Sequence, residues 1–318
     1  ASYGRANVMF SDALYGQAMH SMLRSGRDDG KVADKGPRLD AAEEVEAADW
    51  FDQSKQPVVI SAEDGIQLHG WLFDPDCAGA KPHLYAICCH GYSGQPQDMA
   101  KYAHRFARLG FTVLVPALRG HGLSEGRYAG MGWLDRRDLM RWISLIIGSD
   151  ADARILLQGK SMGAAAVMMT VGEPDLPRNV VAAVEDCGYA SVGQQFIDCA
   201  RSMFHLPKFL AKPIVTTMGA IARRRAGYGF QEASCVEQLK HATIPMLFIH
   251  GGADDFVPSR ALDENFDACA SIDRQKLLIP SAGHSMSAST APVGYWSGGN
   301  EVGRGGAGSG GAWGGRVG

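Results

Sequence analysis

The first stretch that could carry chemistry is Gly159-Lys160-Ser161-Met162-Gly163, which fits the pattern G-x-S-x-G. An apolar run at 155–157 precedes it and a small apolar segment follows, so the serine is expected at a sharp turn between a strand and a helix. Such a turn strains the serine backbone, and side chains in place of the glycines would collide with neighbouring backbone. We predict that Ser161 is a nucleophile whose neighbour Met162 aims its N–H at an oxyanion. A plain helix N-cap is the alternative.

A nucleophilic serine needs a base and an acid that orients the base. In the strand-turn-helix architecture these follow in the order Ser, Asp or Glu, His. The segment HGGADDFVP follows an apolar run and offers Asp254 and Asp255, and His284 lies in PSAGHS after the last strand signal. We predict Asp254 as the acid and His284 as the base. Asp186 in EDCGY is the reserve acid, with a loop-fixing role as its other reading.

The oxyanion hole needs a second backbone donor, from the loop after an earlier strand. The segment His90-Gly91-Tyr92-Ser93-Gly94 occupies such a position. Its glycines permit close approach to a reacting carbonyl, so we expect Tyr92 N–H to be that donor. We expect His90 to fix its own loop, and a plain turn is the alternative for the whole segment.

These residues need a sheet that carries them at the ends of its strands. The segment 57–73 reads as a hairpin around Asp64-Gly65, and buried strands are expected within 84–91, 111–117, 154–159, 179–186, 244–252 and 275–284. Helical patterns at 99–109, 130–147 and 164–172 alternate with them. The fold class predicted is α/β, with a mostly parallel central sheet flanked by helices.

The rhythm of strands and helices breaks between about 187 and 243, where we expect a helical cap insertion. Residues 1–49 are polar and are predicted to form a loosely packed arm, residues 50–296 the catalytic domain, and residues 297–318 a glycine-rich tail that is disordered or non-native. Apolar cap residues are expected to line or cover an acyl pocket, although for any one of them packing against the sheet is the stronger expectation. They are Phe196, Met203, Phe204, Phe209, Ile214 and Met218.

Composition narrows the classes of partner. The formal charge of -3 over 318 residues gives no footprint for nucleic acid. Seven cysteines without zinc spacing read as free thiols, and no phosphate loop is found, so no metal and no cofactor are predicted. No signal peptide or transmembrane segment is apparent in this chain.

The same residues resemble the α/β-hydrolase superfamily, and within it the bacterial membrane-anchored cell-surface serine hydrolases. The resemblance runs from about Trp50 to Trp296, through landmarks such as CCHGYSG, LRGHGLSEGRYAGMGWLDRRDL, GKSMGAAAVMMTVGE and SAGHS. It implies the same three catalytic residues and the same two oxyanion donors as the reasoning above. It also implies an anchor upstream of residue 1 and a cell-surface location.

Three positions depart from the family pattern. Ala117 replaces the aspartate usual before the RGHG loop, and the last helix, expected after GYW, gives way to glycine-rich sequence. Lys160 puts a charge in the variable position of the elbow. An ammonium directed at the histidine would disfavour an imidazolium, whereas one directed at solvent or a carboxylate would be harmless.

The function predicted is hydrolysis of carboxylic esters of small acyl substrates through an acyl-enzyme. A peptidase or amidase with the same triad is the alternative among enzymes, with Asp198 and Glu232 as weak candidates for binding a substrate amine. A non-catalytic binding protein on a hydrolase fold is the alternative from another class. The oligomeric state is left open.

Overall fold

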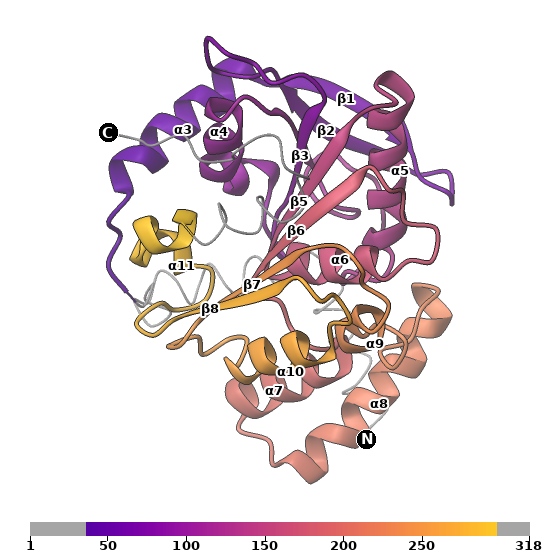
Figure 1. Ribbon diagram of the computed structural model, residues 1–318. Helices are drawn as coiled ribbons and strands as arrows, with labels where there is room; N and C mark the ends of the chain where they lie inside the picture. The colour runs from indigo at the N-terminus through magenta and orange to yellow at the C-terminus, as the bar shows by residue number, and fades with distance from the viewer. Residues whose placement is uncertain (1–35, 298–318) are drawn as a thin grey trace.

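The computed structural model describes residues 36–297 (Figure 1). In chain order its strands are β1 (Gln56–Ser61), β2 (Gln67–Phe73), β3 (Leu84–Cys89), β4 (Thr112–Pro116), β5 (Arg154–Lys160), β6 (Val180–Asp186), β7 (Met246–Gly251) and β8 (Arg274–Ile279). Its helices are α3 (Ala41–Ser54), η1 (Pro96–Met99), α4 (Ala100–Arg108), α5 (Asp135–Ser149), α6 (Met162–Val171), α7 (Val192–Phe204), α8 (Lys208–Arg225), α9 (Cys235–Leu239), α10 (Arg260–Ala268) and α11 (Ser287–Thr290). All but the first residue of the predicted tail (297–318) and most of the predicted arm lie outside the described residues.

The eight strands form one sheet in the order β1-β2-β4-β3-β5-β6-β7-β8. Strands β1 and β2 are antiparallel to their neighbours, and β3 to β8 run parallel. This confirms the predicted mostly parallel sheet. Because the carboxyl ends of parallel strands meet at one edge, the loops after β3, β5, β7 and β8 can converge there.

Helices cover both faces of the sheet (Figure 1). Along β5 the side chains alternate between two cores: Ile155 and Leu157 join the core under α5 and α6, and Leu156 joins the core under α3 and α4. Such strands, buried on both faces, read as continuous apolar runs, which is why the sequence located them well.

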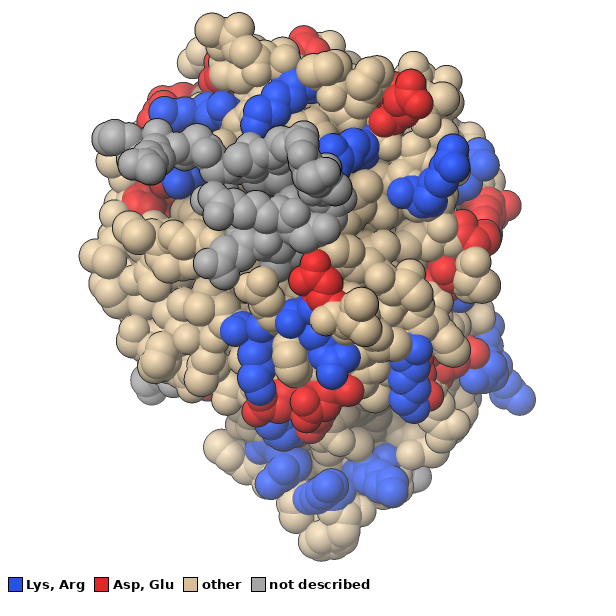
Figure 2. Space-filling model, viewed as in Figure 1, with Lys and Arg blue, Asp and Glu red and all other residues tan. Residues whose placement is uncertain are grey.

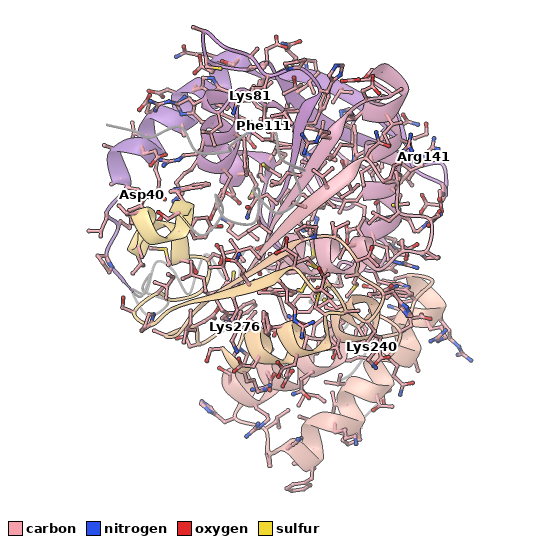
Figure 3. The ribbon with its side chains drawn as sticks, in the orientation of Figure 1. Asp40, Lys81, Phe111, Arg141, Lys240 and Lys276 are labelled. Carbon is pink, nitrogen blue, oxygen red and sulfur yellow. The ribbon has the colours of Figure 1, made fainter. Side chains whose placement is uncertain are left out.

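Residues 41–49 differ from the predicted loose arm, because they belong to α3. Ala47 and Phe51 on this helix are fully buried, and Lys101 Nζ of α4 lies 2.5 Å from Asp40 and 3.0 Å from Glu44. Figure 3 places Asp40 between α3 and α11. The predicted boundary at residue 49 therefore falls inside a helix that packs on the domain.

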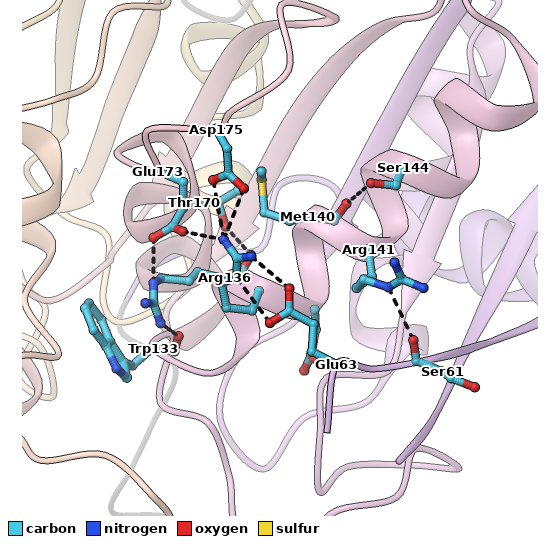
Figure 4. Close-up of polar contacts among 12 residues, drawn as sticks. Ser61, Glu63, Trp133, Arg136, Met140, Arg141, Ser144, Thr170, Glu173 and Asp175 are labelled. Atoms are coloured by element: carbon cyan, nitrogen blue, oxygen red, sulfur yellow. Dashed lines mark hydrogen bonds and ion pairs between the residues drawn. The ribbon is translucent and has the colours of Figure 1, made fainter. Parts of the chain in front are cut away.

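Helix α5 begins at Asp135, five residues after the start of the predicted pattern at Gly130. The Asp135 carboxylate accepts a hydrogen bond from Gly132 N at 2.7 Å and so closes a turn before the helix. On the helix, Arg136 and Arg137 both bind Glu173 at the end of α6, at 2.7 and 2.8 Å (Figure 4). These ion pairs fasten α5 to the carboxyl end of α6, the helix that follows Ser161.

Two further segments bear on the predictions. Helices α7 and α8 connect β6 to α9 and form a lobe, residues 192–225, that projects from the rest of the molecule (Figure 1).

Residues 292–297 are also helical, and the buried Tyr295 ring lies 6.0 Å from that of Tyr102. A helix therefore already includes the GYW segment, after which the last helix was expected. The sequence after residue 297 lies outside the described range.

Candidate active site

Ser161 lies at the junction of β5 and α6 with φ 57° and ψ −118°, a backbone conformation that residues other than glycine rarely adopt. The flanking glycines are required by space: a Cβ on Gly159 would collide with the Gly163 carbonyl, and a Cβ on Gly163 with the carbonyls of Cys89 and His90. The strain is held in place because Ser161 N donates to Asp186 O at 2.8 Å. The local geometry is that of a nucleophile elbow.

The three residues predicted as a triad lie together. Ser161 Oγ is 2.9 Å from His284 Nε2, and His284 Nδ1 is 2.8 Å from Asp254 Oδ2. Asp254 follows β7 and His284 follows β8, so adjacent strand ends supply the acid and the base. The ring of Phe256 lies 5.0 Å from that of His284 and shields one side of it.

Asp254 is held by its own loop. Its Oδ1 accepts hydrogen bonds from Phe256 N and Val257 N, each at 2.9 Å, which leaves Oδ2 for His284. Burial alone would raise the pKa of Asp254, but hydrogen bonds from His250 and His284 outweigh burial and hold that pKa well below its ordinary value. An ionised Asp254 keeps the proton of His284 on Nδ1, so that Nε2 can accept from Ser161.

His250 is a residue of the site that the sequence analysis missed. It ends β7, is fully buried, and places Nε2 3.0 Å from Val257 O and 3.4 Å from Asp254 Oδ2. Burial tends to lower the pKa of His250, but the hydrogen bond to Asp254 outweighs burial and raises that pKa overall. The signal in the sequence was the spacing of four residues between His250 and the acid across one turn.

The reserve acid Asp186 is placed differently. It ends β6, and its backbone carbonyl accepts the hydrogen bond from Ser161 N. Its side chain is fully buried, and burial raises its pKa. Among the described residues the carboxylate bonded to His284 is that of Asp254, so Asp186 acts on the elbow through its backbone.

The loop after β3 approaches the serine closely. A Cβ on Gly91 would lie 3.2 Å from Ser161 Cβ and 3.7 Å from its Oγ, so the backbone before Tyr92 is in contact with the elbow. Met162 is the first residue of α6, whose early N–H groups have no partner within the helix. Both predicted donors thus belong to backbone beside Ser161.

Two buried histidines fix this loop. His90 donates from Nδ1 to Gly91 O at 2.8 Å and accepts Leu118 N at Nε2, at 3.0 Å. Burial, assisted by His121, lowers the pKa of His90 to about 3, so His90 stays neutral and can accept. His121 Nε2 in turn accepts Ser93 N at 3.2 Å. The loop that starts at Ala117 is therefore ordered, although the aspartate usual there is absent.

Lys160 is oriented toward η1 and α4. Its Nζ lies 3.4 Å from Asp98 O and 5.9 Å from the centre of the Tyr102 ring. The ammonium therefore has a carbonyl and an aromatic face as partners.

The apolar residues predicted to line an acyl pocket do not act as one group. Phe196 stacks on Phe230 at 4.8 Å and Met218 is fully buried, so both belong to the core. Phe209 is 74% exposed. The side chains of Met203 and Phe204 lie outside what the structure describes.

No helix within residues 36–297 has the length and apolar character needed to cross a bilayer.

Comparison with known proteins gives a consistent result. A family described as serine aminopeptidase, S33, matches residues 80–220. YqkD of Bacillus subtilis is 27% identical over 219 residues, 68% of this chain and 69% of its own, and Rv2307c of Mycobacterium tuberculosis is 29% identical over 231 residues, 72% of each chain; both are called uncharacterized.

Solved structures share the fold. The Pyrococcus furiosus esterase Pf2001 superposes with a TM-score of 0.61 at 21% identity, over 78% of this chain and 91% of its own. The Pyrococcus horikoshii acylaminoacyl peptidase gives a TM-score of 0.52 at 15% identity, over 74% of this chain and 39% of its own. The family match and the fold together support a serine hydrolase of the α/β type.

Proposed function

We propose that this chain is a serine hydrolase of the α/β type that cleaves carboxylic ester bonds of small acyl substrates through an acyl-enzyme on Ser161. The observation that carries the proposal is the hydrogen-bonded series from Ser161 Oγ through His284 to Asp254, at 2.9 and 2.8 Å. Such a series, on a strained elbow, is the arrangement that activates a hydroxyl for attack on a carbonyl carbon.

In this mechanism His284 Nε2 accepts the Ser161 proton as Oγ attacks the ester carbonyl. The carbonyl oxygen becomes an oxyanion, which the N–H groups of Tyr92 and Met162 stabilise. The tetrahedral intermediate collapses, and the alcohol leaves with the proton held by His284. Water, deprotonated by His284, then attacks the acyl carbon, and the acid is released while Ser161 regains its proton. Asp254 stabilises the imidazolium in both halves.

A peptidase or amidase is the second candidate, because the matching family is described as a serine aminopeptidase. An aminopeptidase needs a carboxylate for the free amine of its substrate. The two acids considered for that role are each engaged elsewhere: Asp198 pairs with Arg260, and Glu232 accepts from Gly229 N and lies 3.4 Å from Arg223. This pairing favours the ester substrate, as in a carboxylesterase.

The test is fluorophosphonate labelling of the full chain followed by peptide mapping. We expect one adduct on Ser161, lost on heat unfolding and in Ser161→Ala, and retained in the control Ser144→Ala, whose hydroxyl bonds within α5. Labelling elsewhere, or none on folded protein, would contradict the proposal and favour a binding protein on a hydrolase fold.

A paired assay separates the two enzyme candidates. Turnover of p-nitrophenyl butyrate is compared with that of an aminoacyl p-nitroanilide at equal enzyme concentration. We expect ester turnover to dominate by orders of magnitude, and comparable amide turnover would assign the chain to the peptidases.

A further inference from the structure

The start of α8 exposes apolar side chains at the end of the α7–α8 lobe. Phe209 is 74% exposed and Leu210 is 45% exposed, in the first turn after Pro207. Other apolar residues of the same helix, such as Met218, are fully buried. Exposed apolar side chains indicate an interaction surface when a second feature, here positive charge, accompanies them.

Positive charge predominates along the whole lobe, including the turn that carries Phe209 and Leu210. Between Asp198 and Glu232 the chain contains no Asp or Glu and six Lys or Arg residues, although the whole chain has a formal charge of -3. Figure 2 shows Lys and Arg side chains on the projecting lower lobe. Lys208 and Lys212 lie one helical turn apart, on either side of Phe209 and Leu210 in the sequence. The lobe is therefore a cationic surface on an acidic protein.

A cavity of about 550 Å³ opens between this lobe, α9 and α10. Its charged lining comprises Arg201, Lys208, Arg260, Asp198 and Glu264. Arg260 pairs with both acids, with Asp198 in a short contact and with Glu264 at 3.4 Å. In the part of the chain that the structure describes, Arg201 and Lys208 have no carboxylate within ion-pair distance, so the cavity offers two cations to an anion.

We propose that the end of the α7–α8 lobe docks on an anionic phospholipid bilayer, with Phe209 and Leu210 among the acyl chains and Arg201, Lys208 and Lys212 at the headgroup phosphates. An anionic bilayer attracts basic side chains electrostatically, and apolar side chains beside them can insert into its acyl-chain region. Two apolar side chains offer far less area than the roughly 800 Å² per partner of a specific protein interface. The shape also fits, because the lobe projects (Figure 1).

The test is co-sedimentation of full-length Ser161→Ala protein with vesicles, so that binding is measured without hydrolysis and independently of the proposed function. Vesicles of phosphatidylglycerol and phosphatidylcholine are compared with vesicles of phosphatidylcholine alone. We expect binding to the anionic vesicles, weakened by salt because the attraction is screened. Equal binding to both kinds of vesicle, or to neither, would overturn the proposal.

Variants of exposed residues locate the surface. Phe209→Ser/Leu210→Ser should weaken binding more than tenfold, and Lys208→Glu should weaken it at least fivefold, since each cation contributes about fivefold. The matched control is Ile272→Ser, because Ile272 is a fully exposed apolar residue on the turn before β8. An unchanged affinity in the Phe209/Leu210 variant would refute docking through the lobe. A dimer by light scattering that this variant abolishes would instead assign the surface to a second copy of the chain.

Discussion

The elbow region (residues 159–163 with the loop 90–94) and the α7–α8 lobe differ in how tightly their residues are packed. In the elbow region, backbone meets backbone so closely that Gly163 has no room for a Cβ, and histidines such as His90 are buried with both ring nitrogens bonded. In the lobe, Phe209 and Lys208 face outward. Catalytic groups need fixed distances, so they lie where tight packing holds the backbone in place. A surface that binds variable partners needs no such packing.

The largest difference between the two regions should appear when one methyl group is added to a glycine in each of them. Gly163→Ala puts a Cβ into the carbonyls of Cys89 and His90, so we expect about 3 kcal/mol of destabilisation and at least 100-fold less activity. Gly219→Ala in α8 meets only ordinary contacts with Phe230 at 3.4 and 3.5 Å. It should stabilise the protein by about 0.5–1 kcal/mol through helix propensity.

Urea unfolding and ester turnover measure both variants. Equal stability of Gly163→Ala and Gly219→Ala would show that the elbow region relaxes as easily as the lobe, and the contrast between the two regions would fail.

The second prediction concerns His250, which acts as a positioning residue for Asp254. In His250→Gln we expect about tenfold lower kcat with little change in KM, because the acid loop loses the contacts of the imidazole with Val257 O and Asp254 Oδ2. A raised pKa in the folded state means that His250 contributes stability below pH 6.5, lost as pH rises through its folded pKa. The variant should lack that part of the pH dependence.

The control for this variant is His241→Gln, at an exposed position after α9. A kcat and a pH–stability curve that match those of the wild type in His250→Gln would leave His250 as a packing residue.

The third prediction uses Glu185, which is fully buried at the end of β6 and accepts Gly188 N at 2.9 Å. Burial raises the pKa of Glu185 to about 8 from an unfolded value of 4.5. The folded state therefore holds a proton that the unfolded state releases, and the free energy of unfolding falls as pH rises from 4.5 to 8. Glu185→Gln should remove this loss and raise Tm by about 5 °C at pH 8, with little gain at pH 4.5.

Thermal unfolding across this range tests the prediction, with Glu237→Gln on the exposed surface of α9 as the control. A gain that is the same at every pH would mean that Glu185 is ionised in the folded protein.

The sequence located the elbow because its glycines report the close approach of backbone, and it located the strands because both their faces are buried. It favoured Asp254 over the reserve Asp186 by position alone, since both follow strands and only the direction of each side chain separates them. His250 escaped notice because its role depends on a contact across a turn. Helix α3 was missed for a related reason: its partner Lys101 lies far along the chain. The triad itself stays a prediction until Ser161 is labelled.

The smallest effect is expected at the position of the elbow that drew attention in the sequence. Lys160 Nζ has Asp98 O at 3.4 Å and the Tyr102 ring at 5.9 Å as partners, so its charge is engaged on the side of η1 and α4. Lys160→Met keeps the length of the side chain and removes the charge, and we expect less than about a threefold change in kcat at pH 7. If the ammonium instead opposed the imidazolium of His284, kcat would rise tenfold or more and the lower limb of the pH–rate profile would move to higher pH, since removal of a positive charge favours protonation of the histidine. The direction of that limb thus separates a lysine that belongs to the scaffold of the elbow from one that tunes its base.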